Sequence, residues 1–208
     1  MLFIVGGASG SGKSSALSNL SDSWVDVVVR DEDTFGYHPD FDSRWRHATT
    51  QTCLIEAVIH QEHGRDMILG GQLPLGEVLA CPAAAELDGI VPCMLICSDE
   101  ERNARLRQRT GQGATQTQLE WARWLEGHAR SPHHERDWMR QFNTPTMQWA
   151  RWWDWPAGDK RWAIEVFDTT GQSVAAVTQT LVDWMERSRQ KRAAGLLPLS
   201  RGWSGSFG

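Results

Sequence analysis

A chain of 208 residues can bury one core of ordinary size, and it is too short for two independent domains to be expected. Its formal net charge of -5 argues against a broad basic face, so long nucleic acid is not an expected partner. Its four cysteines form no CxxC pair and have no matching histidine spacing, which indicates neither a zinc site nor a disulfide framework.

No targeting or membrane segment is expected. An apolar run begins at residue 2 and leaves no room for a basic leader, and no stretch is long enough to span a bilayer. With the cysteines interpreted as buried thiols in a reducing compartment, we expect a cytoplasmic protein without membrane contact.

The first predicted element is a strand over residues 2–5, which leads directly into the pattern GxxxxGK[ST]. Glycines allow successive backbone N–H groups to face one concavity, and the following helix adds the positive end of its dipole, so this loop suits a polyphosphate. Lys13 would contact the outer phosphates and Ser14 would ligate Mg²⁺. A Gly/Ser linker is the alternative, but strand, loop and helix follow in the order that phosphate binding needs. The expected nucleotide contacts are Gly7, Ala8, Ser9, Gly10, Ser11, Gly12, Lys13, Ser14 and Ser15.

A second buried strand is predicted over residues 25–29, and acidic residues follow it. Carboxylates at the carboxyl end of a parallel strand face the ligand crevice of an open α/β sheet. Asp31 and Asp33 are two positions apart, so both side chains can address one site. The alternative is that either residue only caps the following turn.

A helix over about 44–63 and a strand over 67–69 come next. That strand stops at Gly70, Gly71 and Gln72, which form either a plain glycine-rich turn or a place where a substrate approaches the backbone. The Gln72 amide can donate and accept hydrogen bonds to a polar substrate group. Another helix, over 75–87, is expected to be interrupted near Pro82.

The fourth predicted strand, 93–97, feeds a helix that a capping box of Ser98 and Glu101 begins. Arg102, Arg105 and Arg109 form one stripe on this helix and could stabilise a transferring phosphoryl group. A solvated charged face is the alternative. Arg109 is the preferred choice, because it precedes a glycine break at 111–113 of the kind found in lids.

Residues 111–160 form a tryptophan-rich insertion, expected to be helical, with a capping box of Thr117 and Glu120 and a further helix starting at Ser131. Its aromatic side chains either pack as core or wall a pocket for a planar substrate, helped by Arg123 and Arg151. A fifth strand over 162–167, an amphipathic helix and a flexible tail from 193 complete the chain.

These motifs together resemble the small P-loop kinases, such as shikimate, gluconate and uridine kinases and chloramphenicol phosphotransferase. The resemblance covers about residues 2–110 and 162–185. It implies an α/β fold, a P-loop NTPase three-layer α/β/α sandwich with a five-stranded parallel sheet of order 2-3-1-4-5. One domain, 1–192, would carry the helical insertion between strands 4 and 5 at about 111–160, followed by the tail, 193–208.

The resemblance also implies an ATP- and Mg²⁺-dependent kinase that phosphorylates a hydroxyl of a small molecule. Asp33 would be the base, with Asp31 on the metal side and with Lys13 and Arg109 on the phosphates. Because the third strand ends without an acidic residue, Asp31 would have to supply the usual carboxylate there. Further contacts follow by resemblance: for the substrate, Asp33, Gly70, Gly71 and Gln72; for the nucleotide, Arg105, Thr170 and Gly171.

The acceptor stays open between an antibiotic, a nucleoside and another metabolite, and a homodimer is possible in principle. A GTPase-type switch is an alternative, but its DxxG pattern at 33–36 comes too soon after the loop and no NKxD motif occurs. A kinase acting on nucleic-acid 5′ ends would use the tryptophans for stacking, which the net acidity does not favour.

Overall fold

Five parallel strands form the centre of the protein in the computed structural model, which describes residues 1–21, 27–35, 43–140 and 144–205, without the side chains of Ser21, Asp33 and Ser43. The sheet has the order β2-β3-β1-β4-β5, so the predicted strand order is confirmed. The strands are β1 (Leu2–Gly6), β2 (Val27–Asp31), β3 (Asp66–Gly71), β4 (Ile90–Ile96) and β5 (Glu165–Asp168).

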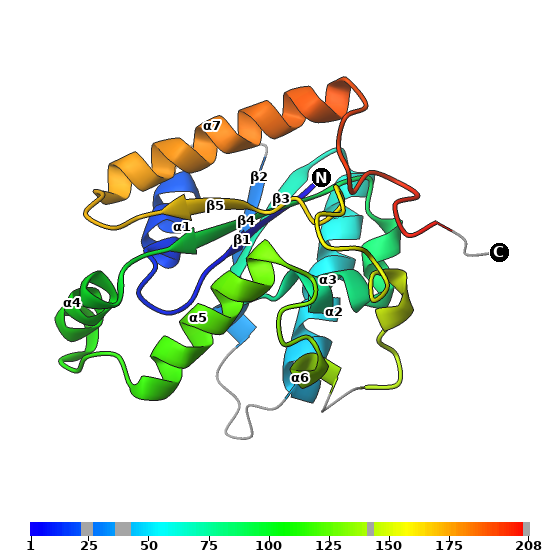
Figure 1. The fold of residues 1–208 in the computed structure, drawn as a ribbon. Coiled ribbons are helices and arrows are strands. Elements are labelled where there is room, and N and C mark those ends of the chain that lie inside the picture. The colour runs from blue at the N-terminus through cyan, green and yellow to red at the C-terminus, as the bar shows by residue number, and fades with distance from the viewer. Residues whose placement is uncertain (22–26, 36–42, 141–143, 206–208) are drawn as a thin grey trace.

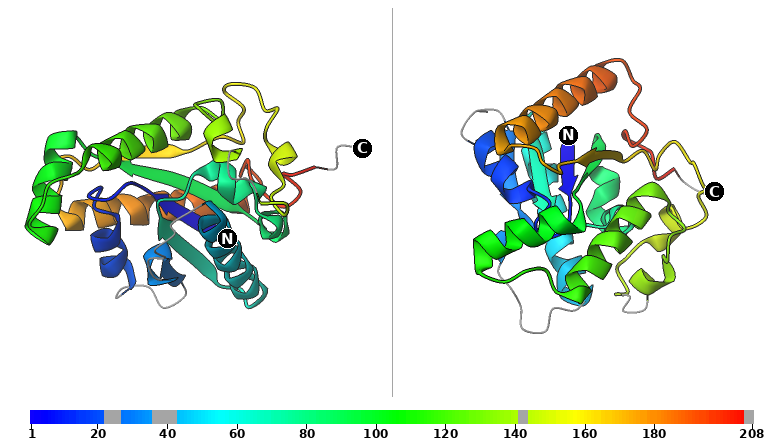
Figure 2. Two further views of the ribbon diagram at one scale, coloured as in Figure 1. Left: turned by 90° about the horizontal axis from the view of Figure 1, so that it is seen from below. Right: turned by 60° about the vertical axis from the view of Figure 1, so that its left-hand side comes forward.

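Helices cover both faces of this sheet (Figure 1). One face carries α1 and α7, and the other carries α2, α3 and α5 (Figures 1 and 2). The three-layer α/β/α prediction is therefore confirmed. The helices are α1 (Lys13–Ser21), η1 (Glu32–Phe35), α2 (Ser43–Glu62), α3 (Leu75–Ala80), η2 (Pro82–Glu86), α4 (Asp99–Thr110), α5 (Gln116–Arg130), α6 (Asp137–Arg140), η3 (Trp149–Arg151) and α7 (Val174–Ala193).

The central strand β1 shows why two hydrophobic clusters form. Its side chains alternate across the sheet, so Leu2 and Ile4 join the cluster under α2, α3 and α5, while Phe3 and Val5 join the cluster under α1 and α7. All four strand pairings are parallel. The carboxyl ends of the strands therefore meet at one edge, where loops can build a site.

The insertion differs in detail from the sequence prediction. Thr115, not Thr117, caps α5, and it forms a reciprocal capping box with Gln118. No helix starts at Ser131, because turns follow it and α6 begins only at Asp137. Residues 144–164 are mostly turns with one short 3₁₀ helix, so the insertion is less helical than expected.

The segment after α7 is packed, which differs from the predicted flexible tail. Leu199 and Trp203 are buried in the cluster under α2, α3 and α5. The Ile90 amide donates to the Leu199 carbonyl over 3.0 Å, and Arg201 pairs with Asp88 at 2.5 Å. Two apolar side chains and this pairing fix the segment to the amino end of β4.

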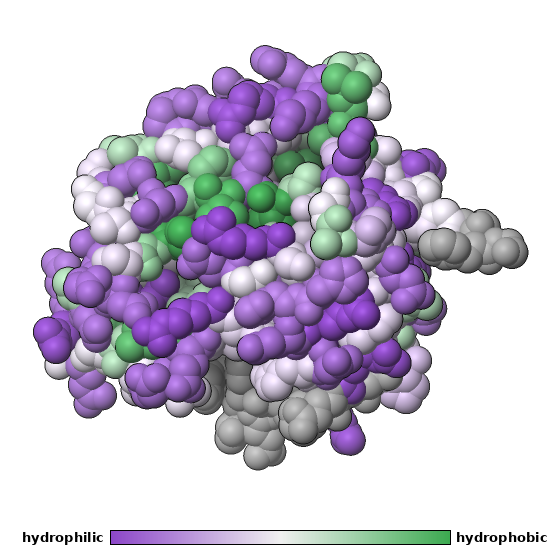
Figure 3. Space-filling model, viewed as in Figure 1, coloured by the Kyte–Doolittle hydropathy of each residue, from purple (hydrophilic) through white to green (hydrophobic). Residues whose placement is uncertain are grey.

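Apolar side chains also gather below α7, along the edge strand β5 (Figure 3). Nearby, α7, β4, β5 and the C-terminal segment line a hollow of about 250 Å³ at the amino ends of the strands, away from the glycine loop. Among the described residues, no helix has the length and apolar character to cross a membrane.

Candidate active site

The glycine loop connects β1 to α1 at the carboxyl edge of the sheet. Gly10 and Gly12 have φ of 83° and 89°, which side chains with a Cβ rarely adopt. The Ser11 amide bonds back to the Ala8 carbonyl over 3.1 Å, and the Ala16 amide bonds to Gly12 over 3.1 Å as α1 begins. The loop thus ends in a helix N-terminus that faces the site.

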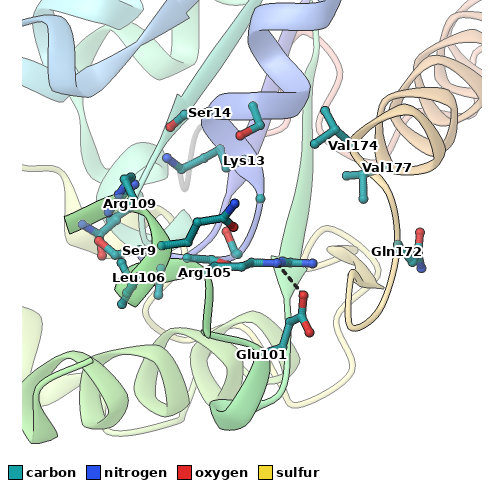
Figure 4. A pocket seen from close by; sticks show the side chains of 17 residues that line it. Ser9, Lys13, Ser14, Glu101, Arg105, Leu106, Arg109, Gln172, Val174 and Val177 are labelled. Atoms are coloured by element: carbon teal, nitrogen blue, oxygen red, sulfur yellow. Dashed lines mark hydrogen bonds and ion pairs between the residues drawn. The ribbon is translucent and has the colours of Figure 1, made fainter. Parts of the chain in front are cut away.

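A cavity of about 480 Å³ opens beside this loop (Figure 4). Lys13 is only 6% exposed and lines it from the first turn of α1. Gln72, predicted as a substrate contact, also reaches the cavity from the end of β3. The lining residues are Ala8, Ser9, Gly10, Ser11, Gly12, Lys13, Ser14, Ser15, Gln72, Glu101, Arg105, Leu106, Gln108, Arg109, Gln172, Val174 and Val177.

Ser14 lines this cavity and contacts Asp31, the last residue of β2. The Ser14 hydroxyl donates a hydrogen bond of 3.1 Å to the Asp31 carboxylate. A hydroxyl and a carboxylate oxygen are hard ligands of the kind that Mg²⁺ accepts together with phosphate oxygens, so these residues fit that ion. Within the described ranges, no group of three His, Cys, Asp or Glu side chains could hold a metal alone.

Asp33 follows in η1, and its side chain lies outside the described part of the chain. Sequence reasoning passed over its neighbour Glu32, whose side chain is buried. A Cβ on Gly71 would lie 2.7 Å from Glu32 Oε2, and one on Gly70 would clash with Leu17. Gly70 and Gly71 are the last two residues of β3 and not a turn, so the predicted strand end at residue 69 was too early; close packing against Leu17 and Glu32 accounts for both glycines.

The arginines of α4 do not form one equivalent stripe. Arg102 is buried, and its guanidinium donates to the Ser9 carbonyl over 2.6 Å. Arg105 lines the cavity while bonding the Gly10 carbonyl at 3.2 Å and pairing with Glu101 at 2.8 Å, as the dashed line in Figure 4 marks. Arg109 is exposed and lines the cavity. Of the three, only Arg109 keeps a side chain that is not already bonded to the loop.

The loop after β5 is tied to the site through Thr169 rather than Thr170. The buried Thr169 hydroxyl donates to the Ser11 carbonyl over 2.9 Å and accepts from Arg105 over 2.9 Å. Thr170 instead bonds Asp168 at 2.6 Å, and this hydrogen bond holds the pKa of the Asp168 carboxyl below its usual value. Neither Thr170 nor Gly171 lines the cavity, whereas Gln172 does; the nucleotide contacts of Thr170 and Gly171 stay predictions.

Four side chains of the insertion form an aromatic ladder: Trp121, Trp124, His128 and Trp138. The first three stack along α5, with ring centroids 4.9 Å and then 5.1 Å apart. Trp138, at 39% exposure, packs 5.3 Å from Trp121 and brings the ladder to the surface. The inner rings are core, as the packing alternative predicts, whereas the pocket alternative stays a prediction for the accessible ring of Trp138.

Arg46 lies against the outer end of the aromatic ladder and forms a buried ion pair that sequence reasoning missed. It bonds both carboxylate oxygens of Glu77, at 2.6 and 2.5 Å, and lies 5.8 Å from the Trp121 ring centroid. Burial alone would raise the pKa of Glu77, but Arg46 outweighs it and holds that pKa well below the usual value. Neither motif nor periodicity marks this pair, because α2 and α3 are far apart in sequence.

His128 and two predicted pocket arginines have structural partners. The Gly76 amide donates to His128 Nε2 over 3.2 Å, and burial lowers the pKa of His128 to about 3, so the ring is neutral. Arg123 pairs with Asp99 at 2.5 Å, and Arg151 donates to the Cys81 carbonyl at 2.7 Å. The sequence led us to expect Arg123 and Arg151 beside the aromatic rings. The arginine that lies over the rings of Trp121 and Trp138 is instead Arg46.

Comparisons with known proteins bear on the fold. No family model and no curated protein matches the chain. A gluconokinase from Sinorhizobium meliloti is 16% identical with a TM-score of 0.54, covering 91% of this chain and 93% of that one. The fold is that of the P-loop kinases.

Two further solved structures are similar. A protein from Eubacterium ventriosum, titled uncharacterized, is 11% identical with a TM-score of 0.50 and covers 89% of this chain and 98% of that one. A thymidylate kinase from Candida albicans is 13% identical with a TM-score of 0.46 and covers 90% of this chain and 92% of that one. At such identities the likeness concerns the fold alone.

Proposed function

We propose that the protein is an ATP- and Mg²⁺-dependent phosphotransferase that transfers the terminal phosphoryl group of ATP to a hydroxyl of a small molecule. The observation that carries this proposal is the hydrogen bond of 3.1 Å between Ser14 and Asp31, beside the buried Lys13. This pair supports phosphoryl chemistry, because in P-loop enzymes a loop hydroxyl and a carboxylate from another strand hold the Mg²⁺ that neutralises charge on the phosphates.

Each group has a distinct task in this reaction. Lys13 and the loop amides hold the outer phosphates, and Ser14 and Asp31 would bind Mg²⁺, which neutralises charge on the phosphates when bound. Asp33, two residues beyond Asp31, is proposed to orient the acceptor hydroxyl and take its proton. Arg109 is proposed to stabilise the transferring group from the far side of the cavity, since it lines the cavity without a carboxylate partner among the described residues.

We further propose that the acceptor binds on the side of the insertion, near Arg46 and Trp138, and that it is an uncharged molecule with a planar or apolar part. Arg46, the buried guanidinium of that side, is already neutralised by Glu77 at 2.5 Å and is therefore not offered to an acidic acceptor. The partly exposed Trp138 presents an aromatic surface next to it. Antibiotics and nucleosides fit these groups better than sugar acids do, and this is the substrate class that we propose.

The test measures ADP formation from ATP and Mg²⁺ with a panel of nucleosides, aminocyclitols and sugar acids. Asp33→Asn should keep ATP affinity and lose transfer by at least about 100-fold, whereas Asp31→Asn should raise the Mg²⁺ concentration needed for transfer. Asp154→Asn is the matched control, because Asp154 is exposed and does not line the cavity.

Three outcomes contradict parts of the proposal. Native turnover in Asp33→Asn removes the base assignment. ATP binding without acceptor-dependent ADP formation for any compound indicates a switch or binding module instead. Salt-sensitive binding of short single strands, with transfer to their 5′ hydroxyl, indicates a nucleic-acid kinase.

A further inference from the structure

Arg102 lies behind the glycine loop rather than in the cavity. It is 3% exposed, and its Cγ would be 3.0 Å from a Cβ on Gly10, so the side chain runs directly alongside the loop. The guanidinium donates to the Ser9 carbonyl at 2.6 Å and to the Cys97 carbonyl at 3.5 Å. Its Nε has no hydrogen-bond partner among the described residues.

The positive charge of Arg102 has no carboxylate partner among the described residues. Its nearest acidic neighbour on α4, Glu101, is already paired with Arg105 at 2.8 Å. A buried guanidinium held only by carbonyl oxygens keeps a large unfavourable desolvation energy. An anion placed on the other side of the loop would reduce that energy.

The hydrogen bond to Ser9 also fixes one peptide plane of the loop. The Ser9 carbonyl and the Gly10 N–H belong to the same trans peptide, so they point in opposite directions. Because Arg102 holds the carbonyl on the α4 side, the Gly10 N–H is turned away from α4. Within the described part of the chain, that N–H has no hydrogen-bond acceptor of its own.

We propose that Arg102 is a positioning residue that makes the site selective for polyphosphates, by orienting the Gly10 N–H and by holding a buried positive charge that only a bound polyphosphate compensates. Arg102 acts through the loop and never touches the nucleotide. The inference rests on the nucleotide-binding part of the proposed function and is independent of the acceptor.

The experiment compares wild type with Arg102→Met and Arg102→Lys by calorimetric titration with ATP, ADP and AMP, together with thermal unfolding of the nucleotide-free protein. Arg102→Met should weaken ATP binding about tenfold, ADP binding about threefold and AMP binding less than twofold, because the lost attraction grows with phosphate charge. Arg102→Lys should recover most of the ATP affinity. Arg107→Met is the control, since Arg107 is exposed on the same helix and does not line the cavity.

Thermal unfolding separates this role from simple bracing of the fold. The nucleotide-free Arg102→Met protein should unfold at the wild-type temperature or higher, because an uncompensated buried charge has been removed. A lower unfolding temperature, an equal loss for all three nucleotides, or unchanged ATP affinity overturns the proposal. If the wild type itself binds none of the three, the proposed function fails and this inference fails with it.

Discussion

Two buried arginines, Arg46 near the insertion and Arg102 behind the glycine loop, differ in what neutralises their charge. Arg46, on the side of the insertion, bonds both oxygens of the buried Glu77 and packs against tryptophan rings. Arg102, behind the glycine loop, has only carbonyl oxygens as hydrogen-bond acceptors. The charge of Arg46 is neutralised without a ligand, whereas we propose that the charge of Arg102 is neutralised when an anion binds. The comparison teaches that burial of a charge does not by itself show whether the charge serves the fold or a ligand.

The largest expected effect comes from removing the cationic group of the glycine loop itself. Lys13→Ala should lower ATP-dependent transfer by at least about 100-fold, because the buried Lys13 is the charge that we propose to contact the outer phosphates. Turnover and ATP affinity both measure it. Lys160→Ala, an exposed lysine outside the cavity, should match wild type; if both variants behave alike, the loop does not hold phosphate.

The second test removes the carboxylate of the buried ion pair between Arg46 and Glu77. Glu77→Gln should destabilise the protein by about 3 kcal/mol, since it leaves Arg46 buried without its carboxylate. Denaturant unfolding measures this loss. The control is Glu56→Gln, whose partner Arg30 is largely exposed, so a change below about 1 kcal/mol is expected there. Equal effects in the two variants would contradict the structural role of Glu77.

The third test concerns the packing of the insertion against Gly76 in α3. An alanine Cβ at this position in α3 would clash with the Trp152 ring, so Gly76→Ala should cost about 1–3 kcal/mol although alanine normally favours a helix. Adding Trp152→Phe should recover part of the loss. Gly205→Ala, whose nearest heavy atom would be 3.9 Å away, serves as the neutral control. A stabilised Gly76→Ala protein would show that the insertion is not packed on α3.

The smallest expected effect is a pH dependence. The pKa of His128 is lowered from 6.5 to about 3 by burial, so the unfolded chain takes up a proton below pH 6.5 that the folded protein refuses. Stability is therefore complete above 6.5 and falls as the pH drops, by about 1 kcal/mol between pH 7 and 5.5. Unfolding curves across this range measure it, and His128→Gln should flatten the dependence. An unchanged slope in that variant would assign the effect to other groups.

Local sequence signals predicted the arrangement of the residues around the glycine loop. Spacing identified the glycine loop, and the position of Asp31 at a strand end placed it beside Ser14. Strand order followed from the resemblance and is confirmed. These features depend on backbone conformation and strand direction, which short patterns determine.

Contacts between residues far apart in the sequence could not be predicted from local patterns. Arg46 and Glu77 are 31 positions apart, Arg105 and Thr169 are 64 apart, and the Trp152 indole bonds a carbonyl 76 positions away, at Gly76. No periodicity encodes such pairs, because their geometry arises only when helices pack on the assembled sheet. Thr117 was wrong as a helix start because several polar residues there could serve as caps, and Thr115 forms the reciprocal capping box with Gln118. Ser131 was wrong because turns follow it and the next helix begins at Asp137.

The docking of residues 196–203 onto β4 has a consequence for biosynthesis. The Ile90 amide donates a hydrogen bond to the Leu199 carbonyl, and Trp203 is buried in the cluster under α2, α3 and α5. During translation, the amino end of β4 is therefore covered only after residues 196–203 have left the ribosome. Until then, the apolar side chains that Leu199 and Trp203 cover are exposed to chaperones. We expect a chain truncated shortly after α7 to be degraded.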